Sequence, residues 1–239
     1  VQEGRRIEVQ KLIDFDAFEW VPEQQTKGKL FIKSRWEDNM KGDVVRSRWV
    51  LQEFANTKKE GLFAATPTPA AIRVLEYQAV QRGHVLQEAD VQTAFMHTPE
   101  DEEVYTDPPL GFRREGFKWR CKKVINGRRQ GTRCFQEWLS PVLEEVGLKR
   151  GIVDASVYRD DINDISLVVH VDDFHACGPE KALKKMYDQI GKKLLLKVGP
   201  PVHPGDSAKF LGRTKVRGEE EIGTLPAQRH IDELLDGLG

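Results

Sequence analysis

The stretch "LVVHVDDFHACG" at residues 167–178 constrains the fold of this chain more than any other segment. Its Val-rich apolar run predicts a buried strand, and two adjacent acids, Asp172 and Asp173, follow that run directly. Ionised carboxylates at the end of a core strand are costly unless a cation lies between them. The chain either forms a sheet that presents carboxylates at one edge or places both acids in an ordinary polar turn, where Asp is common.

A third acid ends another predicted strand. The run "HVLQEAD" at residues 84–90 has the pattern of a short strand that finishes at Asp90. Adjacent strands of one sheet would bring Asp90 close to Asp172 and Asp173. Such carboxylates favour a Mg²⁺ site, and two ions can support phosphoryl transfer. A zinc- or manganese-binding hydrolase using His170 and His175 is a weaker alternative, because no third His or Cys falls at ligand spacing.

The order of predicted elements favours a sheet with helices packed on one face. Residues 68–83 have helix signals at both ends, with Thr68 as the cap, Pro69 at the first position and Gly83 as the stop. Further helices are predicted at residues 135–146 and 180–197, a hairpin turned at Asn163, and a single strand at residues 208–216. This alternation is typical of an α+β fold of the split βαβ, ferredoxin-like kind.

Charge is segregated along the chain although the net charge is only −1. The segment at residues 118–133 contains seven bases and no acid, and "PEDEEV" at residues 99–104 is strongly acidic. This pattern indicates either a polyanion-binding side or an ordinary solvated face. The three cysteines have neither zinc-site nor disulfide spacing, which favours a reducing compartment. No signal peptide or apolar run of membrane length is found, and the first residue, Val1, suggests a piece of a longer chain.

Six segments in order resemble copia-type retrotransposon reverse transcriptases. "LVVHVDDFHACG" is similar to the YVDD box, "LQEADVQTAFMHTPEDEEVYTDPPLGF" to the segment with a DV-x-TAF core, and "INGRRQGTRCFQEWLSPVL" to the Tyr-Gly-Leu-Lys-Gln-Ala-Pro-Arg region. "SRWVLQEF", "KFLG" and "HIDELL" follow the order of the family. The resemblance implies a right-hand polymerase with fingers, palm and a truncated thumb, and an RNA-directed DNA polymerase activity.

The resemblance also implies functions for single residues. Asp90, Asp172 and Asp173 match the catalytic acids that hold two Mg²⁺ or Mn²⁺ ions, with the carbonyl of Val91 as an extra ligand. Four residues match positions that bind the incoming nucleotide: Arg48, Lys41, Gln130 and Phe95. Residues expected to contact the nucleic acid are His170, Lys122, Lys123, Arg128, Arg129, Arg133, Phe210, Leu211 and Gly212.

The resemblance divides the chain into fingers at residues 1–66 and 98–133, palm at 67–97 and 134–216, and a thumb stub at 217–239. Its implied partners are a primed RNA or DNA template and deoxynucleoside triphosphates. A former connection to ribonuclease H and integrase regions of a Pol polyprotein is also implied, and so is a cytoplasmic (virus-like particle) or nuclear location.

Two departures from the family pattern leave a second interpretation open. His170 replaces the Tyr of the YVDD box, and residues 126–132 have lost the Leu and Pro of theirs. The chain could therefore be a decayed fragment that keeps the fold, and possibly nucleic-acid binding, without catalysis.

Overall fold

The structure is a computed structural model that describes residues 1–54, 59–226 and 228–237. The chain forms two compact units, unit 1 with residues 1–64 and 93–138 and unit 2 with residues 65–92 and 139–239. The two units do not coincide with the predicted segments, because residues 93–97 and 134–138 lie in unit 1 and residues 65–66 in unit 2, and the division into fingers, palm and thumb stub stays a prediction. The predicted thumb stub lies in unit 2, and residues 55–58, 227, 238 and 239 of the predicted segments lie outside the described residues.

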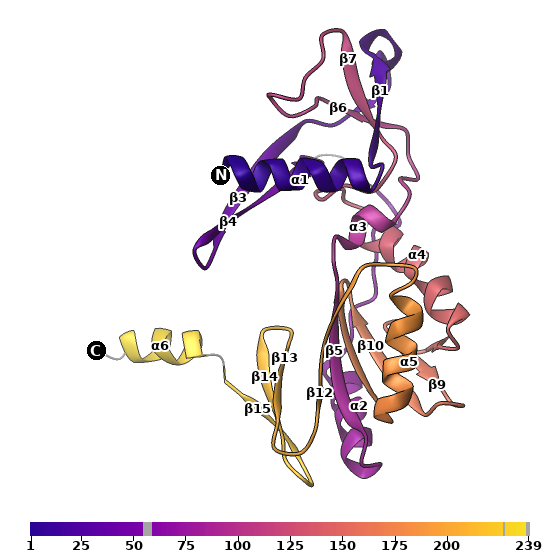
Figure 1. The fold of residues 1–239 in the computed structure, drawn as a ribbon, viewed down its shortest axis with the longest axis vertical. Helices are drawn as coiled ribbons and strands as arrows, with labels where there is room; N and C mark the ends of the chain where they lie inside the picture. Colours follow the sequence, from indigo (N-terminus) through magenta and orange to yellow (C-terminus); the bar gives the residue numbers. More distant parts are fainter. Residues whose placement is uncertain (55–58, 227, 238–239) are drawn as a thin grey trace. The chain divides into compact units, whose positions relative to one another are not determined.

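A six-stranded sheet organises unit 2 (Figure 1). Its order is β12-β5-β11-β10-β9-β8, and every neighbouring pair is antiparallel. The strands are β5 (Val85–Val91), β8 (Lys149–Arg150), β9 (Val157–Asp160), β10 (Ile165–His170), β11 (Asp173–Gly178) and β12 (Leu196–Val202). The hairpin predicted at Asn163 is confirmed as β9–β10, and Asp90 lies opposite Asp173 as expected, although β11 separates β5 from the predicted strand before Asp172.

Helices cover this sheet on both faces, whereas the sequence predicts helices on one face only. In α2 (Pro69–Gln81), Leu75 and Ala79 pack with Leu86, Val168 and Cys177, which lie on one face. The strand residues that point to the opposite face by alternation are also buried: Leu167, Val169, Phe174 and Ala176. The strands with continuous apolar runs are therefore core on both sides. Helix α5 (Glu180–Ile190) contacts β11 and β12, and α4 spans Gly131–Glu145.

The helix signals around α2 are confirmed in detail. The Thr68 hydroxyl accepts a hydrogen bond from the Ala71 N–H at 3.1 Å, Pro69 begins the helix, and Gly83 follows its end in the left-handed region, at φ 62°. A side chain at such a φ would be strained, which is why Gly suits this position.

Two predicted elements of unit 2 are wrong. The helix predicted at residues 180–197 ends at Ile190, because the chain turns after Gly191 and pairs with β5 from Leu196 onward as strand β12. The single strand predicted at residues 208–216 is a hairpin of β13 (Ser207–Phe210) and β14 (Arg213–Arg217). Leu211 and Gly212 form its turn at φ 47° and 74°, as a tight two-residue turn requires. Strand β15 (Ile222–Leu225) extends this small sheet, and α6 (Gln228–Asp236) follows it.

Unit 1 is built around α1 (Gln2–Asp14), which the sequence analysis does not predict. It contacts the hairpin of β3 (Ser34–Lys41) and β4 (Val44–Leu51). A second sheet has the order β1-β7-β6-β2, with β1 (Phe18–Pro22), β2 (Leu30–Phe31), β6 (Val104–Thr106) and β7 (Phe117–Cys121). The short helices are α3 (Ala94–His97) and a 3-10 turn, Glu23–Thr26. None of the described helices is long and apolar enough to cross a membrane.

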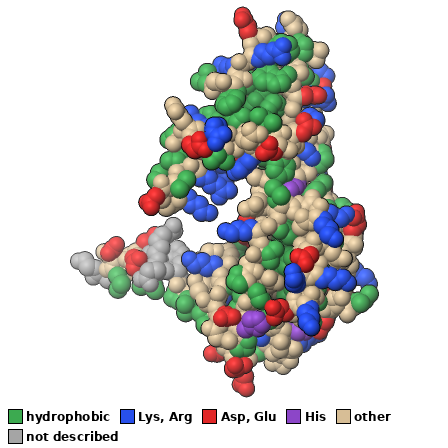
Figure 2. All heavy atoms as spheres, in the orientation of Figure 1, with side chains coloured by type: hydrophobic (Ala, Val, Ile, Leu, Met, Phe, Trp, Pro, Cys, Tyr) green, Lys and Arg blue, Asp and Glu red, His purple; other side chains and the backbone are tan. Residues whose placement is uncertain are grey.

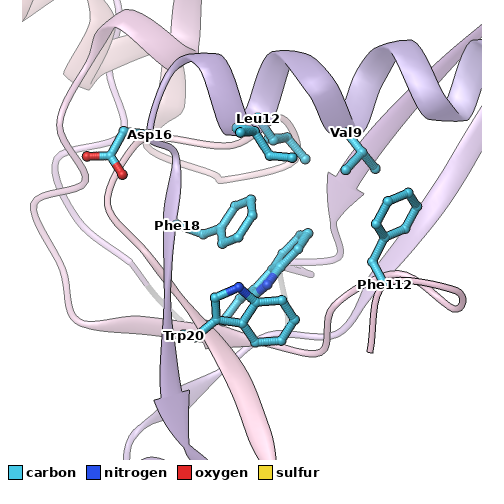
Figure 3. A pocket seen from close by; sticks show the side chains of 8 residues that line it. Val9, Leu12, Asp16, Phe18, Trp20 and Phe112 are labelled. Atoms are coloured by element: carbon cyan, nitrogen blue, oxygen red, sulfur yellow. The ribbon is translucent and has the colours of Figure 1, made fainter. Parts of the chain in front are cut away.

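A pocket of about 330 Å³ lies in unit 1 against α1 (Figure 3). Its lining is apolar and aromatic apart from one carboxylate, Asp16, which forms an ion pair with Lys122. The remaining lining residues are Val9, Leu12, Ile13, Phe18, Trp20, Phe112 and Trp119. This pocket therefore lacks the convergent polar groups of a reaction site.

Candidate active site

Strand pairing brings the three acids together. Asp90, near the end of β5, lies directly opposite Asp173, the first residue of β11. The Val91 N–H donates to the Asp172 carbonyl at 2.8 Å. In this antiparallel ladder, Asp90 and Asp173 are therefore a pair of facing residues that exchange no backbone hydrogen bonds with each other. Side chains are closest in pairs of that kind. Asp172 lies in the two-residue turn that joins β10 to β11, and all three acids belong to unit 2.

The turn that presents these acids is strained. Val171 has φ 56°, in the left-handed region, although it is β-branched. A β-branched residue there is a genuine outlier that costs on the order of 1–3 kcal/mol. Such strain is concentrated at functional sites, because the surrounding structure must hold it in place.

The acids repel one another and fit a divalent cation. Burial raises the pKa of Asp173, and the nearby Asp172 and Asp90 raise it further, whereas His170 partly offsets this. Within the part of the chain that the structure describes, no three His, Cys, Asp or Glu side chains are arranged to hold an ion by themselves. Mg²⁺ does not need such a cage, since one or two carboxylates and substrate phosphates usually hold it. The donor set therefore fits Mg²⁺ completed by substrate.

A buried charged pair, which sequence reasoning missed, lies next to the acids. His175 follows Asp173 by two residues on β11, pairs in register with Glu88, and places its Nδ1 2.7 Å from Glu88 Oε1. Burial lowers the pKa of His175, but Glu88 and Glu76 outweigh burial and raise it to about 9. With its ring held between carboxylates, His175 gives no support to the zinc-hydrolase alternative.

The "KFLG" segment is only partly exposed. Phe210 is 4% exposed and stacks on His175, with ring centroids 4.5 Å apart and an interplanar angle of 17°. Its predicted contact with nucleic acid stays a prediction, although its ring is turned toward His175. Leu211 and Gly212 are exposed at the turn, so their predicted contact with nucleic acid stays a prediction.

The predicted nucleotide-binding residues Arg48 and Lys41 are exposed on the β3–β4 hairpin of unit 1. Strand alternation places Arg35 and Arg46 on the same face as Arg48 and Lys41. Sequence reasoning missed both, although the two-residue spacing of Arg46 and Arg48 in a strand indicates a shared face. Figure 2 shows Lys and Arg side chains gathered beside this hairpin. A pocket of about 380 Å³ next to Arg48 is lined by Arg35, Glu37, Val50, Leu51, Gln52, Glu53, Phe54, Asn126 and Gly127.

Arg128, predicted to bind nucleic acid, is buried among carboxylates, and its contact with nucleic acid stays a prediction. Its guanidinium is fully enclosed and forms ion pairs of 2.6, 2.9 and 2.6 Å with Glu53, Glu100 and Glu102. Burial would lower the pKa of Arg128, but these carboxylates raise it instead. The acidic segment at residues 99–104 thus folds onto the basic one, a pairing that distance along the sequence conceals.

The same contacts count against the other predicted nucleic-acid contacts in this region. Lys122 pairs with Asp16, and Arg133 lies 3.1 Å from Asp101 and 2.8 Å from Glu137. Lys123 donates to the His97 carbonyl, and the backbone N–H of Arg129 donates to Glu53, so neither contact neutralises the side-chain charge. The ion pairs with carboxylates therefore offset the charges of Lys122 and Arg133 in particular.

Gln130 and Phe95 also lie in unit 1, and their contact with the nucleotide stays a prediction. Gln130 is 1% exposed, and its Nε2 donates to Asp101 at 2.7 Å. Phe95 is half-buried in edge-to-face contact with Phe135, at 6.3 Å between ring centroids. Val91 is buried in unit 2, and the metal-ligand function of its carbonyl stays a prediction.

Comparison with known proteins agrees with this geometry. The family described as reverse transcriptase (RNA-dependent DNA polymerase) matches residues 19–236. The retrovirus-related Pol polyprotein from transposon TNT 1-94 of Nicotiana tabacum is 28% identical over 228 residues, 88% of this chain but 17% of that protein. The corresponding polyprotein from transposon RE2 of Arabidopsis thaliana is 28% identical over 176 residues, 69% of this chain and 12% of that protein.

Solved structures show the same fold. A foamy viral protease-reverse transcriptase in complex with double-stranded DNA has a TM-score of 0.56 at 15% identity, over 95% of this chain and 36% of that chain. Telomerase from Candida albicans has a TM-score of 0.54 at 9% identity, over 93% and 49% of the two chains. The chain therefore belongs to the reverse transcriptase family, as a domain of the copia type with the α+β fold of right-hand polymerases.

Proposed function

We propose that this chain is the fingers and palm part of an RNA-directed DNA polymerase that extends a primer 3′-hydroxyl on an RNA or DNA template. The observation that carries the proposal is the facing pair of Asp90 and Asp173, with Asp172 on the strained turn beside them. Because the chain spans only 17% and 12% of the two polyproteins, the activity, substrates and partners of the whole protein are part of this proposal.

In this proposal the three acids of unit 2 hold two Mg²⁺ or Mn²⁺ ions, which, when bound, lower the pKa of the primer hydroxyl and stabilise the leaving pyrophosphate. The repulsion between the Asp90 and Asp173 carboxylates supports this assignment, because a cation between them removes it. Arg48 binds the triphosphate through paired N–H donors, and Lys41 adds a positive charge on the same hairpin face.

The proposed setting follows from the polyprotein relatives. Ribonuclease H and integrase regions would lie elsewhere in the same Pol polyprotein. The enzyme would then work in a cytoplasmic virus-like particle or in the nucleus.

A primer-extension assay tests the proposal directly. The purified chain is incubated with a labelled primer on RNA and DNA templates, deoxynucleotides, and Mg²⁺ or Mn²⁺, beside an Asp173→Asn control. Extension that requires the metal and Asp173 is the expected result. A folded chain that binds the primed template and never extends it would contradict the proposal in favour of the decayed alternative, which the altered box around Arg128 supports.

Arg48→Ala is expected to raise the KM for deoxynucleotides by about 10–100-fold, because a hydrogen bond to a charged group contributes about 1.5–3 kcal/mol. Steady-state extension kinetics measure this effect. The matched control is Arg6→Ala, an exposed arginine of the same unit that pairs with Glu3. An unchanged nucleotide KM in an active Arg48→Ala variant would remove Arg48 from the triphosphate site.

Phe95→Val is expected to raise ribonucleotide incorporation relative to deoxynucleotide incorporation by about tenfold. An aromatic ring below the sugar leaves a 2′-hydroxyl without a partner, which costs about 1–3 kcal/mol. Single-nucleotide incorporation efficiencies measure the ratio. Phe135→Leu changes the fully buried ring that Phe95 contacts and should lower stability without changing this ratio. If Phe95→Val behaves as Phe135→Leu does, Phe95 is a core residue.

A further inference from the structure

The β13–β14 hairpin is attached to the rest of unit 2 through side chains of one face. Phe210 stacks on His175 of β11. Lys215 Nζ lies 2.8 Å from Glu76 Oε1 of α2, and Arg217 Nη2 donates to the Ala79 carbonyl at 3.2 Å. Lys215 and Arg217 alternate along β14, and Glu76 and Ala79 lie three residues apart on α2, so each pair lies on one face of its element.

The strand register connects this attachment to the catalytic acids. His175 and Glu88 form the pair two residues along from Asp173 and Asp90, so the two pairs lie on the same face of the sheet. The ring that supports Phe210 is therefore the nearest same-face neighbour of Asp173 on β11. At the other end of the contact, Phe210 directly precedes the exposed turn of Leu211 and Gly212.

The ring of His175 is held in one orientation. Its Nδ1 is hydrogen-bonded to Glu88 Oε1 at 2.7 Å, its Nε2 lies 3.7 Å from Glu76 Oε1, too far for a hydrogen bond, and the side chain is fully buried. One buried hydrogen bond to a specific carboxylate restricts the ring, whereas an aliphatic side chain in the same space could slide or rotate. The nearly parallel stacking then transmits the orientation of the imidazole to Phe210.

We propose that His175 is a positioning residue that, through Phe210, holds the Leu211–Gly212 turn at a set place relative to Asp90 and Asp173. In an enzyme that extends a primer, this contact sets where the primer end meets the acids. The inference rests on the proposed function for its effect on primers, whereas the structural contact itself can be tested without catalysis.

The first measurement follows the hairpin alone. Hydrogen exchange of the backbone amides at residues 207–217 is compared in the wild type, Phe210→Leu, Phe210→Tyr and His175→Gln. Phe210→Leu and His175→Gln should speed exchange in this segment by about tenfold, because an aromatic pair adds stability of that order. Phe210→Tyr keeps the ring and should stay within about twofold of the wild type. The control His97→Gln changes a histidine of unit 1 that stacks on Trp138, and should leave the hairpin unchanged.

The second measurement separates positioning from general support. In extension kinetics, Phe210→Leu and His175→Gln should raise the KM for the primed template by about tenfold and leave the nucleotide KM within about twofold. Phe210→Tyr should restore the wild-type value. A merely structural role would lower the active fraction and leave both KM values unchanged, which would overturn the inference.

The two measurements distinguish failure of the inference from failure of the proposed function. Unchanged hairpin exchange in both Phe210→Leu and His175→Gln overturns the inference whether or not the chain polymerises. If the wild type never extends a primer, the proposed function fails, and a hairpin exchange that responds as expected still supports the contact. If either variant fails to fold, the other decides the outcome.

Discussion

Asp173→Asn is expected to lower primer extension by about a thousandfold or more and, at the same time, to stabilise the metal-free protein. The loss of rate follows because metal ions contribute several kcal/mol to charge stabilisation, and each 1.4 kcal/mol or so corresponds to tenfold in rate. The gain in stability follows because Asn removes one of the mutually repelling carboxylates beside Asp90 and Asp172.

The pH dependence of this second effect has a definite sign. Because the folded-state pKa of Asp173 is raised, the native protein holds this proton more tightly than the unfolded chain does. Its ionisation therefore lowers the free energy of unfolding as pH rises from the ordinary pKa of Asp through the raised one. Because the asparagine side chain does not ionise, the Asp173→Asn variant avoids this fall in the free energy of unfolding and should be more stable than the wild type at neutral pH.

Urea unfolding in EDTA and extension in Mg²⁺ measure the two effects. Asp188→Asn, at an exposed helical position paired with Lys184, is the matched control and should change neither. Added Mg²⁺ should stabilise the wild type more than Asp173→Asn, since an ion that binds only the folded state stabilises it. If Asp173→Asn extended primers at the wild-type rate, Asp173 would not be part of the catalytic site.

Arg128→Met is expected to destabilise the protein by about 3–5 kcal/mol, because it leaves charged carboxylates without the buried cation that pairs with them. Glu100 is the most affected, since its side chain is fully buried and burial already raises its pKa. Arg128→Lys keeps the positive charge but not the planar set of N–H donors, and should therefore lose less stability than Arg128→Met does.

Chemical denaturation at neutral pH measures the loss. The matched control is Arg133→Met, which removes a partly exposed arginine paired with Asp101 and Glu137 and should cost less than about 1 kcal/mol. If Arg128→Met unfolds at the same denaturant concentration as Arg133→Met, the enclosed ion pairs contribute nothing to folding. Nucleic-acid binding should fall in neither variant beyond the loss of folded protein.

Local sequence signals predicted those parts of unit 2 whose cause is local. Thr68, Pro69 and Gly83 determine the limits of α2, and the apolar runs before Asp90 and Asp172 predict β5 and β10, although it is β11, between them, that pairs with β5. The alternation of apolar and polar residues could not show where a strand reverses direction. Residues 208–216 have the pattern of one continuous strand, but the positive φ of Leu211 and Gly212 reverses the chain, and Phe210 before this turn is buried.

Contacts between distant segments lie outside what a single sequence reveals. Arg128 looks like a surface base because its neighbours along the chain are basic or neutral. Its partners come from residues 53, 100 and 102, and only folding of unit 1 brings them together. The chain from Leu196 onward is likewise ambiguous in sequence, because its pairing with β5 makes it a strand and not the end of a helix.

The turn between β10 and β11 concentrates two thermodynamically unfavourable features in three residues, the positive φ of Val171 and the repelled carboxylate of Asp173. Gly or Asn at residue 171, and Asn at residue 173, would each stabilise the hairpin. Either replacement would stabilise the metal-free fold, and Asn at residue 173 would do so while removing a carboxylate of the proposed metal site. The same three residues therefore set folding stability against the proposed metal binding.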